Sequence, residues 1–187
     1  MGAFKPLLPF GRSTVIESCI ANLRTGGVEN LVIVVGHRHE ELQAKLKNQD
    51  VVFAINPDPD SEMSVSIACG LNLINESAKA LLISPVDLPA VPPEIVMQLI
   101  TEWRAGARLL QPEHDGRGGH PVLIDLLYRQ ELLTLDPDQG LRGLFAAHRE
   151  EVRRMPVASP YVAGDMDTWE DYRQLHQDVF GVPPAGI

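Results

Sequence analysis

The feature that most constrains this chain is the alternation of short apolar runs with longer segments of helical periodicity. Three of the runs lie at 31–36 (LVIVVG), 51–55 (VVFAI) and 80–84 (ALLIS), and apart from the final Gly36 and Ser84 they consist of aliphatic or aromatic residues. Continuous runs of this kind are typical of strands that are covered on both faces, as in parallel sheets. Between them, apolar residues recur at three- and four-residue spacing, which predicts amphipathic helices.

The same alternation extends over most of the chain. We expect helices after Ser13 or Thr14, around Ile67, after Pro92, and at 39–47, 125–135, 140–149 and 168–177, and further strands at 107–112, 120–124 and 151–157. This order predicts one domain over 1–187, with a doubly wound, mostly parallel sheet and helices on both faces. Ligands of such sheets bind at the carboxyl ends of the strands, so the residues that follow each strand are the candidates for a site.

The bulk composition excludes several classes of function. A chain of 187 residues can bury a real core, and its formal net charge is −9. Because the basic residues are scattered, we expect no nucleic-acid partner that is gripped through its phosphates. The longest apolar run, 31–35, is too short to span a membrane. Cys19 and Cys69 lie in helical patterns and are interpreted as buried thiols of a reducing compartment, so we expect a cytoplasmic protein.

Asp87 follows the apolar run at 80–84 and stands between Pro85 and Pro89. A carboxylate held by a stiff loop at the end of a central strand is a suitable Mg²⁺ ligand, because Mg²⁺ prefers carboxylate and phosphate oxygens. The alternative is that Asp87 caps the next turn or helix, and the spacing alone supports both interpretations.

Asp165 and Asp167 stand two residues apart before the last predicted helix. In an extended segment, alternate side chains point the same way, so both carboxylates could converge on one ion. The alternative is a capping sequence in which Thr168 begins the helix and the acids favour its N-terminus. Each interpretation can hold for different residues.

Two further segments hold candidate ligand-binding residues. The glycine-rich stretch 115–122 (DGRGGHPV) leads into a strand, and its glycines allow close approach of the backbone while His120 can donate a hydrogen bond. The pattern alone favours a hairpin-like connection there. Lys5 precedes the first helix and could meet a phosphate, although a single lysine is equally well explained as a surface residue.

Taken together, five stretches resemble one family in their order. MGAFKPLLPFG (1–11) is similar to the second half of LAAGxSxRMGxxKxLLPxxG, and NPDPDSEMSVSIACGL (56–71) to a segment that ends GMSSSLxxGL. LLISPVDLPAVPPEIV (81–96) resembles a strand with its metal-aspartate loop, and GRGGHPVLI (116–124) and DMDTWEDY (165–172) resemble a GHPVL loop and a DxDTPEDY end. These belong to nucleotidyltransferases that resemble molybdenum cofactor cytidylyltransferase, and the resemblance spans nearly the whole chain.

The resemblance implies a Rossmann-like fold of the nucleotide-diphospho-sugar transferase type and a Mg²⁺-dependent reaction. An acceptor phosphate, such as that of the molybdopterin cofactor, would attack the α-phosphorus of an NTP, with CTP favoured over GTP, and pyrophosphate would leave. By resemblance, Lys5 would neutralise phosphate charge, and Asp87, Asp165 and Asp167 would hold the metal. The remaining implied site residues are Ser64 and Ser66 on the nucleotide side, and Gly119 and His120 on the acceptor side. A molybdoenzyme or a second copy of the chain is a candidate protein partner.

The sequence departs from the family pattern at three places. Glu62 stands where glycine usually precedes Met63, and Trp169 replaces the usual proline. The opening strand and the LAAGxSxR loop have no counterpart, so we expect an N-terminally truncated domain, either through a late assigned start codon or through a real loss. A missing central strand would leave 31–36 or 80–84 with an unpaired edge. The alternatives to an active enzyme of this family are an inactive member that acts as a binding module, and a nucleotidyltransferase for a sugar or alcohol phosphate.

Overall fold

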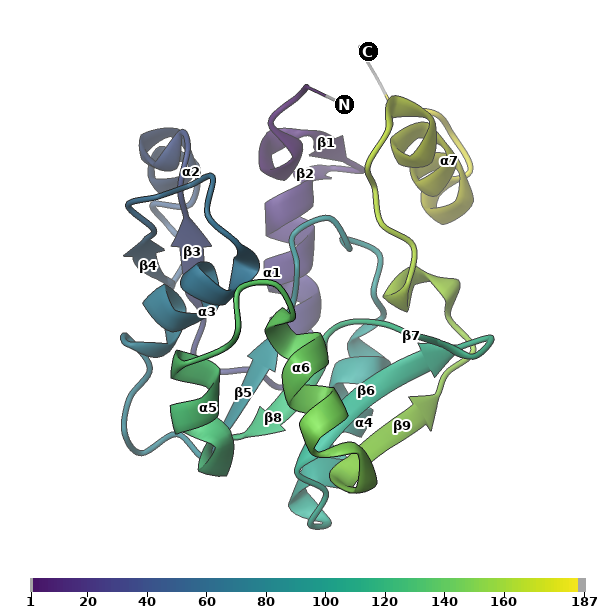
Figure 1. Cartoon of the computed structure of the whole chain (residues 1–187). Coiled ribbons are helices and arrows are strands. Elements are labelled where there is room, and N and C mark those ends of the chain that lie inside the picture. The colour runs from purple at the N-terminus through teal and green to yellow at the C-terminus, as the bar shows by residue number, and fades with distance from the viewer. Residues whose placement is uncertain (1, 185–187) are drawn as a thin grey trace.

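The computed structural model describes residues 2–184, and its largest sheet has five strands (Figure 1). They are β5 (Ala80–Ile83), β6 (Leu109–His114), β7 (Arg117–Gly118), β8 (Val122–Asp125) and β9 (Val152–Pro156). β8 lies between β5 and β6 and is antiparallel to both, while β9 pairs in parallel with β6. β5, β6 and β9 therefore run in one direction, and β8 and the short β7 run against them.

A separate pair of strands, β3 (Val32–Val35) and β4 (Val52–Ile55), is parallel and in register from Val32 opposite Val52. Within residues 2–184, neither strand is hydrogen-bonded to the five-stranded sheet. Among these residues β3 pairs with β4 and β5 with β8, and the other edge of each strand has no strand partner. All four residues of β5 and three of the four in β3 are only half-buried.

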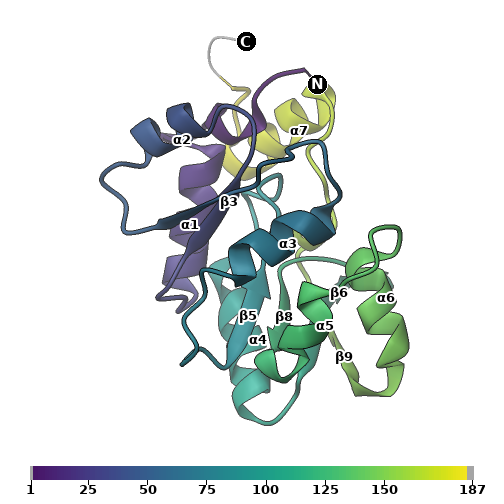
Figure 2. The ribbon, with the colours of Figure 1, turned by 60° about the vertical axis from the view of Figure 1, so that its left-hand side comes forward.

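Helices cover both faces of the five-stranded sheet (Figures 1 and 2). On one face, Leu109 and Ile124 pack in a cluster with Leu71 of α3 (Met63–Leu71), and the neighbouring helices α5 (Arg129–Leu133) and α6 (Gly140–Ala147) complete it. On the other face, Leu110 and Leu123 pack with Leu99 of α4 (Pro93–Arg104). Because adjacent strand residues point to opposite faces, the sheet buries both sides. The doubly wound α/β architecture is confirmed.

The helix α1 (Val15–Thr25) begins at Thr14, one of the two predicted caps. The backbone N–H and the hydroxyl of Thr14 each donate to Glu17 Oε2 at 2.8 Å, which forms a capping box. Ile16 of α1 packs with Val35 of β3 and Leu42 of α2 (His39–Lys45). A second interface joins α1 to α4.

Gly26 ends α1 at the point where it approaches α4 most tightly. A Cβ atom at Gly26 would lie 2.4 Å from Cβ of Val96, so the close contact requires glycine there. The two cysteines are both free thiols, as predicted, with Cys19 buried in α1 and Cys69 half-buried in α3.

The chain opens with structure that the sequence did not predict. Instead of a loop that leads directly to a helix, the segment forms a 3₁₀ turn, η1 (Lys5–Leu7), and a small antiparallel hairpin of β1 (Pro9–Phe10) and β2 (Ser13–Thr14). The last helix, α7 (Trp169–Phe180), lies beside this hairpin (Figure 1). The Tyr172 hydroxyl donates to the Pro9 carbonyl at 2.5 Å, and the rings of Phe10 and Tyr172 are buried together.

Several predicted element boundaries differ from the structure, most clearly those of two helices. The helix expected at 125–135 starts only at Arg129, because Asp125 ends β8 and accepts a hydrogen bond from the Leu127 N–H at 2.9 Å. That bond opens the 3₁₀ turn η2 (Leu126–Tyr128). The helix expected at 140–149 ends at Ala147 and is followed by η3 (Arg149–Glu151). The turn η4 (Pro160–Val162) was not predicted.

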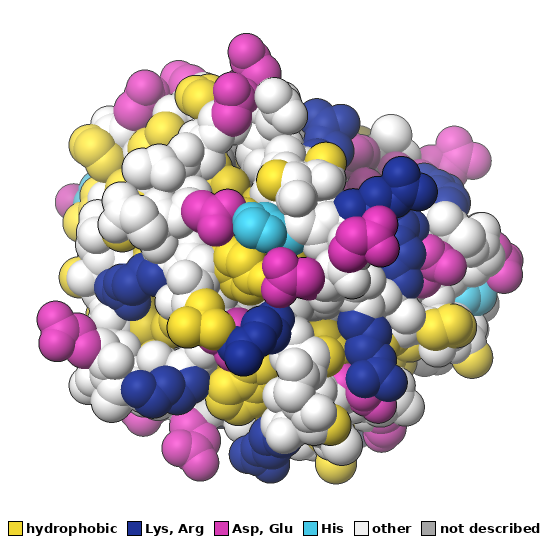
Figure 3. Space-filling view, turned by 60° about the horizontal axis from the view of Figure 1, so that its bottom comes forward, with side chains coloured by type: hydrophobic (Ala, Val, Ile, Leu, Met, Phe, Trp, Pro, Cys, Tyr) yellow, Lys and Arg dark blue, Asp and Glu magenta, His cyan; other side chains and the backbone are white. Residues whose placement is uncertain are grey.

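The surface below the sheet carries both charge signs. On the face in Figure 3, Lys and Arg side chains are interspersed with Asp and Glu side chains and with smaller apolar areas. Mixed charge of this kind forms no continuous basic stripe on that face. Among residues 2–184, no helix combines the length and the apolar character needed to cross a membrane.

Candidate active site

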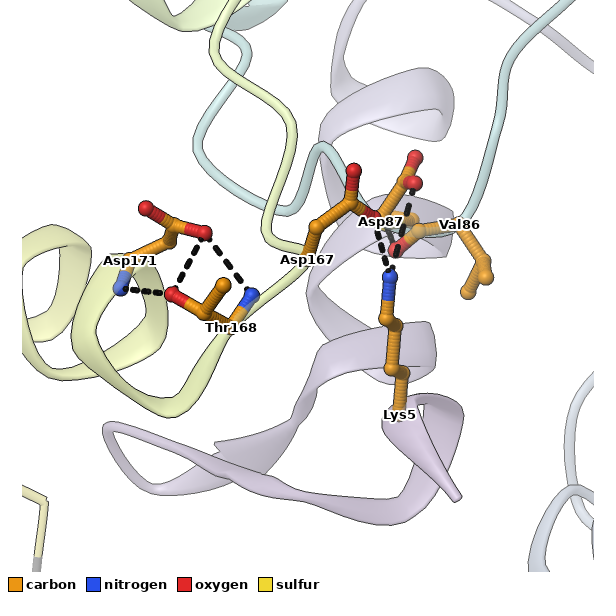
Figure 4. Close-up of polar contacts among 7 residues, drawn as sticks. Lys5, Val86, Asp87, Asp167, Thr168 and Asp171 are labelled. Atoms are coloured by element: carbon orange, nitrogen blue, oxygen red, sulfur yellow. Dashed lines mark hydrogen bonds and ion pairs between the residues drawn. The ribbon is translucent and has the colours of Figure 1, made fainter. Parts of the chain in front are cut away.

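Three segments that are far apart in the sequence meet at Lys5 (Figure 4). The Nζ atom of Lys5 donates a hydrogen bond to Asp167 Oδ1 at 2.6 Å and lies 4.0 Å from Asp87 Oδ2. The lysine comes from η1, Asp87 from the loop after β5, and Asp167 from the segment before α7. One ammonium group therefore bridges two carboxylates at the carboxyl end of a sheet strand.

Asp87 is the most buried acid of this group. Its side chain is 25% exposed, and its Oδ1 atom is buried without a hydrogen-bond partner in the described part of the chain. Burial raises the pKa of Asp87 and Lys5 opposes this rise, while repulsion from Asp165 and Asp167 adds to it. The net effect is that the charged form of Asp87 is only partly compensated by Lys5, and the pKa of Asp87 stays above its ordinary value.

Asp165 and Asp167 stand on either side of a buried residue, Met166. Met166 between them is 1% exposed and packs in the apolar cluster around Tyr172, while both acids are exposed. Both raise the pKa of Asp87, so both carboxylates act on it through space. The predicted alternation of side chains is confirmed, since the neighbour on each side of Met166 faces away from the core.

Other residues provide the cap of α7. The Thr168 hydroxyl accepts from the Asp171 N–H at 3.1 Å, and Asp171 Oδ2 accepts from the Thr168 N–H at 2.7 Å (Figure 4). The capping interpretation therefore applies to Thr168 and Asp171, and it leaves Asp165 and Asp167 unused as caps. Within residues 2–184, no three His, Cys, Asp or Glu side chains are gathered closely enough to hold a metal ion as they stand.

His120 lies close enough to Asp165 and Asp87 for their charges to act on it. Its pKa is lowered by burial, and the charges of Asp165 and Asp87 partly offset this effect. Burial therefore favours the neutral imidazole, which has one N–H donor and one acceptor. The backbone N–H of His120 donates to the Val162 carbonyl at 2.8 Å, which ties the loop to η4.

Gly119, the residue before His120, has a structural role. From the sequence alone, this role could not be distinguished from ligand binding. A Cβ atom at Gly119 would lie 2.1 Å from the Val162 carbonyl oxygen. The close approach is thus to this chain's own backbone. The hairpin interpretation of the glycine-rich stretch is also correct, because β6 and β7 form an antiparallel hairpin across it.

Ser64 and Ser66 lie in the first turns of α3 and have different surroundings. Ser64 is 7% exposed, and its Oγ has no hydrogen-bond partner among the described residues. Ser66 Oγ accepts from Asn56 Nδ2 at 3.0 Å. Among the side-chain contacts of residues 2–184, neither serine has a hydrogen bond to Lys5, Asp87 or Asp167.

Asn56 was not among the predicted site residues. It is 4% exposed, follows β4 directly, and donates from Nδ2 to both Ser61 Oγ and Ser66 Oγ at 3.0 Å. Its Oδ1 accepts from the Asp58 N–H at 3.0 Å. Asn56 therefore shapes the loop that leads into α3. The available signal was its position, an amide residue at the carboxyl end of a predicted strand, although β4 itself is half exposed.

The arrangement offers complementary binding chemistry. Lys5 supplies a positive charge for phosphate oxygens, and three carboxylates with one orphaned buried oxygen supply ligands of the type that hard divalent cations prefer. A neutral imidazole stands beside them. These groups together suit a substrate that carries phosphates and a metal ion.

Comparison with known proteins gives matches over most of the chain. Residues 1–152 match the family described as MobA-like NTP transferase domain. Nicotine blue oxidoreductase from Paenarthrobacter nicotinovorans is 25% identical over 179 residues, which cover 91% of this chain and 87% of that protein. The match to a protein named an oxidoreductase shows that relatives at this distance can carry names of another reaction class.

Solved structures agree with this assignment of the fold. Rv0371c from Mycobacterium tuberculosis, in its complex with manganese, is 26% identical, with a TM-score of 0.79, and covers 94% of this chain and 93% of its own. The molybdopterin-guanine dinucleotide biosynthesis protein A from Archaeoglobus fulgidus is 16% identical, with a TM-score of 0.66, and covers 95% and 91%. The latter likeness shows the fold alone.

Proposed function

This chain belongs to the MobA-like NTP transferase domain family and is a nucleotidyltransferase, and from this premise we propose its reaction: it transfers a nucleoside monophosphate from an NTP to a phosphate-bearing acceptor. The observation that carries the proposal is the position of Lys5 between Asp87 and Asp167, with a buried carboxylate oxygen of Asp87 left without a partner. An anion-binding cation beside metal-binding carboxylates is what such a transfer needs.

In the proposed reaction, a phosphate oxygen of the acceptor forms a bond to the α-phosphorus of the NTP, and the bond from that phosphorus to the pyrophosphate oxygen breaks. Lys5 would bind the phosphate oxygens, where its charge stabilises the charge that develops in the transition state. His120 and Gly119 would lie against the acceptor, so that its phosphate is aligned with the leaving pyrophosphate. Ser64 and Ser66 would contact the nucleotide.

Asp87, with Asp167 and Asp165, would hold a divalent metal ion. The donor set fits such an ion, because all the ligands are carboxylate oxygens and one of them is buried without a partner. When bound, the ion supplies charge neutralisation at the phosphates. We propose Mg²⁺ as the physiological ion, and the manganese complex of the mycobacterial relative makes Mn²⁺ the natural probe.

CTP is the proposed donor and molybdopterin the proposed acceptor. The family model supports an NTP as the donor class, and both CTP and the molybdopterin acceptor rest on the sequence resemblance. The test incubates the chain with α-labelled CTP or GTP, Mg²⁺ or Mn²⁺, and molybdopterin, and measures labelled acceptor and pyrophosphate. One pyrophosphate released for each labelled acceptor is expected, with CTP preferred.

The other outcomes separate the alternatives. Nucleotide binding without pyrophosphate release would favour a binding module. Transfer to a sugar phosphate or alcohol phosphate, with no transfer to molybdopterin, would contradict the proposed acceptor. The proposed reaction class, nucleotidyl transfer, would still hold.

A further inference from the structure

Lys5 occupies the space between the two carboxylates that are proposed to bind the metal. Its Nζ is 2.6 Å from Asp167 and 4.0 Å from Asp87, and its side chain is 25% exposed. A metal ion that bound both carboxylates would have to lie in the same region. An ammonium group and a divalent cation repel each other at such short range, since both are positive and both are attracted to the same two carboxylates.

The charge balance of the site explains why the lysine takes this position. Asp87, Asp165 and Asp167 repel one another, as the upward effect of the other two acids on the pKa of Asp87 shows. Lys5 is the cation that opposes this effect. Without a metal, the ammonium group is thus the counterion that holds Asp87 and Asp167 together, with the charge of Asp165 nearby.

The contact is also built to be released. Asp167 is 69% exposed, so its ion pair with Lys5 is screened by solvent. Exposed pairs of this kind contribute little to stability. The Lys5 stem belongs to the short 3₁₀ turn η1 rather than to a long helix, and no residue of that turn is buried. The ammonium group can therefore leave at low cost once it has another anionic partner.

We infer that Lys5 is an exchangeable stand-in for the metal ion: it holds Asp87 and Asp167 in the empty enzyme and moves to the triphosphate when metal and nucleotide arrive together. The inference rests on the proposed function, because it gives a second role to a residue of the same site. On this inference Lys5 competes with the free metal ion for the carboxylates of Asp87 and Asp167. When the metal ion arrives with a nucleotide, Lys5 binds the triphosphate instead. Metal alone should accordingly bind weakly, and nucleotide should strengthen its binding.

The test measures Mn²⁺ binding directly by electron paramagnetic resonance of the free ion, without substrate turnover. Wild type is compared with Lys5→Ala, with Lys5→Met, which keeps the length of the stem, and with the control Lys45→Ala. Lys45 is paired with Glu17 at 3.2 Å on α2, away from the site. With Mn²⁺ alone, both Lys5 variants should bind about tenfold more tightly than wild type, which equals ~1.4 kcal/mol. Lys45→Ala should bind as wild type.

A second titration adds CTP. In wild type, CTP should increase the affinity of the protein for Mn²⁺ by more than CTP alone accounts for by chelating the ion. In Lys5→Met this increase in affinity should be smaller. If wild type binds Mn²⁺ but Lys5→Met binds it equally or more weakly, the proposed exchange between Lys5 and the metal ion is contradicted. The metal site of the proposed function is then retained. If neither protein binds Mn²⁺ with or without CTP, the metal site of the proposed function fails and the exchange fails with it. Thermal unfolding of each variant shows that the binding data come from folded protein.

Discussion

The backbone N–H of His120 donates a hydrogen bond of 2.8 Å to the carbonyl of Val162. This single contact joins the loop before β8 to η4, and η4 leads within three residues to Asp165. It therefore fixes the distance between two parts of the candidate site that lie about forty residues apart. The contact is close because Gly119, the preceding residue, has no side chain.

Gly119→Ala should disrupt this junction. The new Cβ would lie 2.1 Å from the Val162 carbonyl oxygen, and a backbone atom cannot move aside as a flexible side chain can. Overpacking of this kind typically costs about 1–3 kcal/mol. Urea unfolding should show that loss. Gly164→Ala is the control, because its Cβ would be at an ordinary 3.6 Å from the Pro160 carbonyl, and equal stability of the two variants would contradict the prediction.

Asp87→Asn should abolish transfer while it stabilises the empty protein. A carboxyl group whose pKa is raised on folding makes the native state less stable as pH rises from its ordinary 3.8 through the raised value, so at neutral pH the penalty is present in full. The amide has nearly the same volume and no such penalty. The melting temperature at neutral pH should rise, and transfer should fall by about a hundredfold or more, equal to ~3 kcal/mol of barrier.

Glu40→Gln on the exposed face of α2 is the control for this charge change and should alter neither property. An Asp87→Asn variant that melts below wild type would show that its contact with Lys5 outweighs its burial. A variant that keeps activity within about tenfold of wild type would remove Asp87 from the metal site.

The elements that the sequence predicted well are those with a long periodic signal. The strands β3 and β5 and the helices α1 and α4 each follow from apolar spacing, and Thr14 and Thr168 follow from capping patterns. The hairpin of β1 and β2 has only two residues in each strand, too few for periodicity. The reversed direction of β8 was also not predictable, because an apolar run contains no information about strand direction.

The candidate site likewise has features that local spacing predicts and features that it does not. The exposed–buried–exposed pattern around Met166 was predictable from local spacing, and the structure has it. The bond from Lys5 to Asp167 joins residues 162 positions apart, and no spacing argument could join them. Before the structure, only the family resemblance indicated that these two residues belong to one site. Asn56 was missed because its role is to orient a loop through the hydroxyl groups of Ser61 and Ser66.

His120→Ala should weaken binding of the acceptor more than that of the nucleotide. The imidazole lies beside Asp165 and Asp87 on a loop that is separate from the serines of α3. With molybdopterin and CTP as substrates, we expect the KM for the acceptor to rise about tenfold and the KM for CTP to change by less than about threefold. His37→Ala, an exposed histidine paired only with Asp60 at 3.2 Å, is the control. A larger effect on CTP would reassign the loop to the nucleotide.

The stability of the α5–α6 region should depend on pH through His148. Its Nε2 lies 2.7 Å from Glu131 Oε2 and its Nδ1 3.5 Å from Glu151 Oε1, while the Tyr128 hydroxyl donates to Glu151 Oε2 at 2.6 Å. The hydrogen bond with Glu131 raises the pKa of His148 above its ordinary 6.5, and Glu151 adds to the effect. Arg108 also acts on this cluster, because it lowers the pKa of both Tyr128 and Glu151.

A histidine with a raised pKa stabilises the fold fully below its unfolded pKa, and that stabilisation is lost as pH rises through the folded pKa. His148→Asn should therefore be less stable than wild type near pH 6, by about 1 kcal/mol or less because the pair is near the surface. The difference should shrink as the pH is raised toward about 9, and added salt should reduce it. Urea unfolding of both proteins across this range measures the effect. A difference that is constant with pH would show that His148 acts through its packing against the Tyr128 ring, whose centroid is 4.8 Å away.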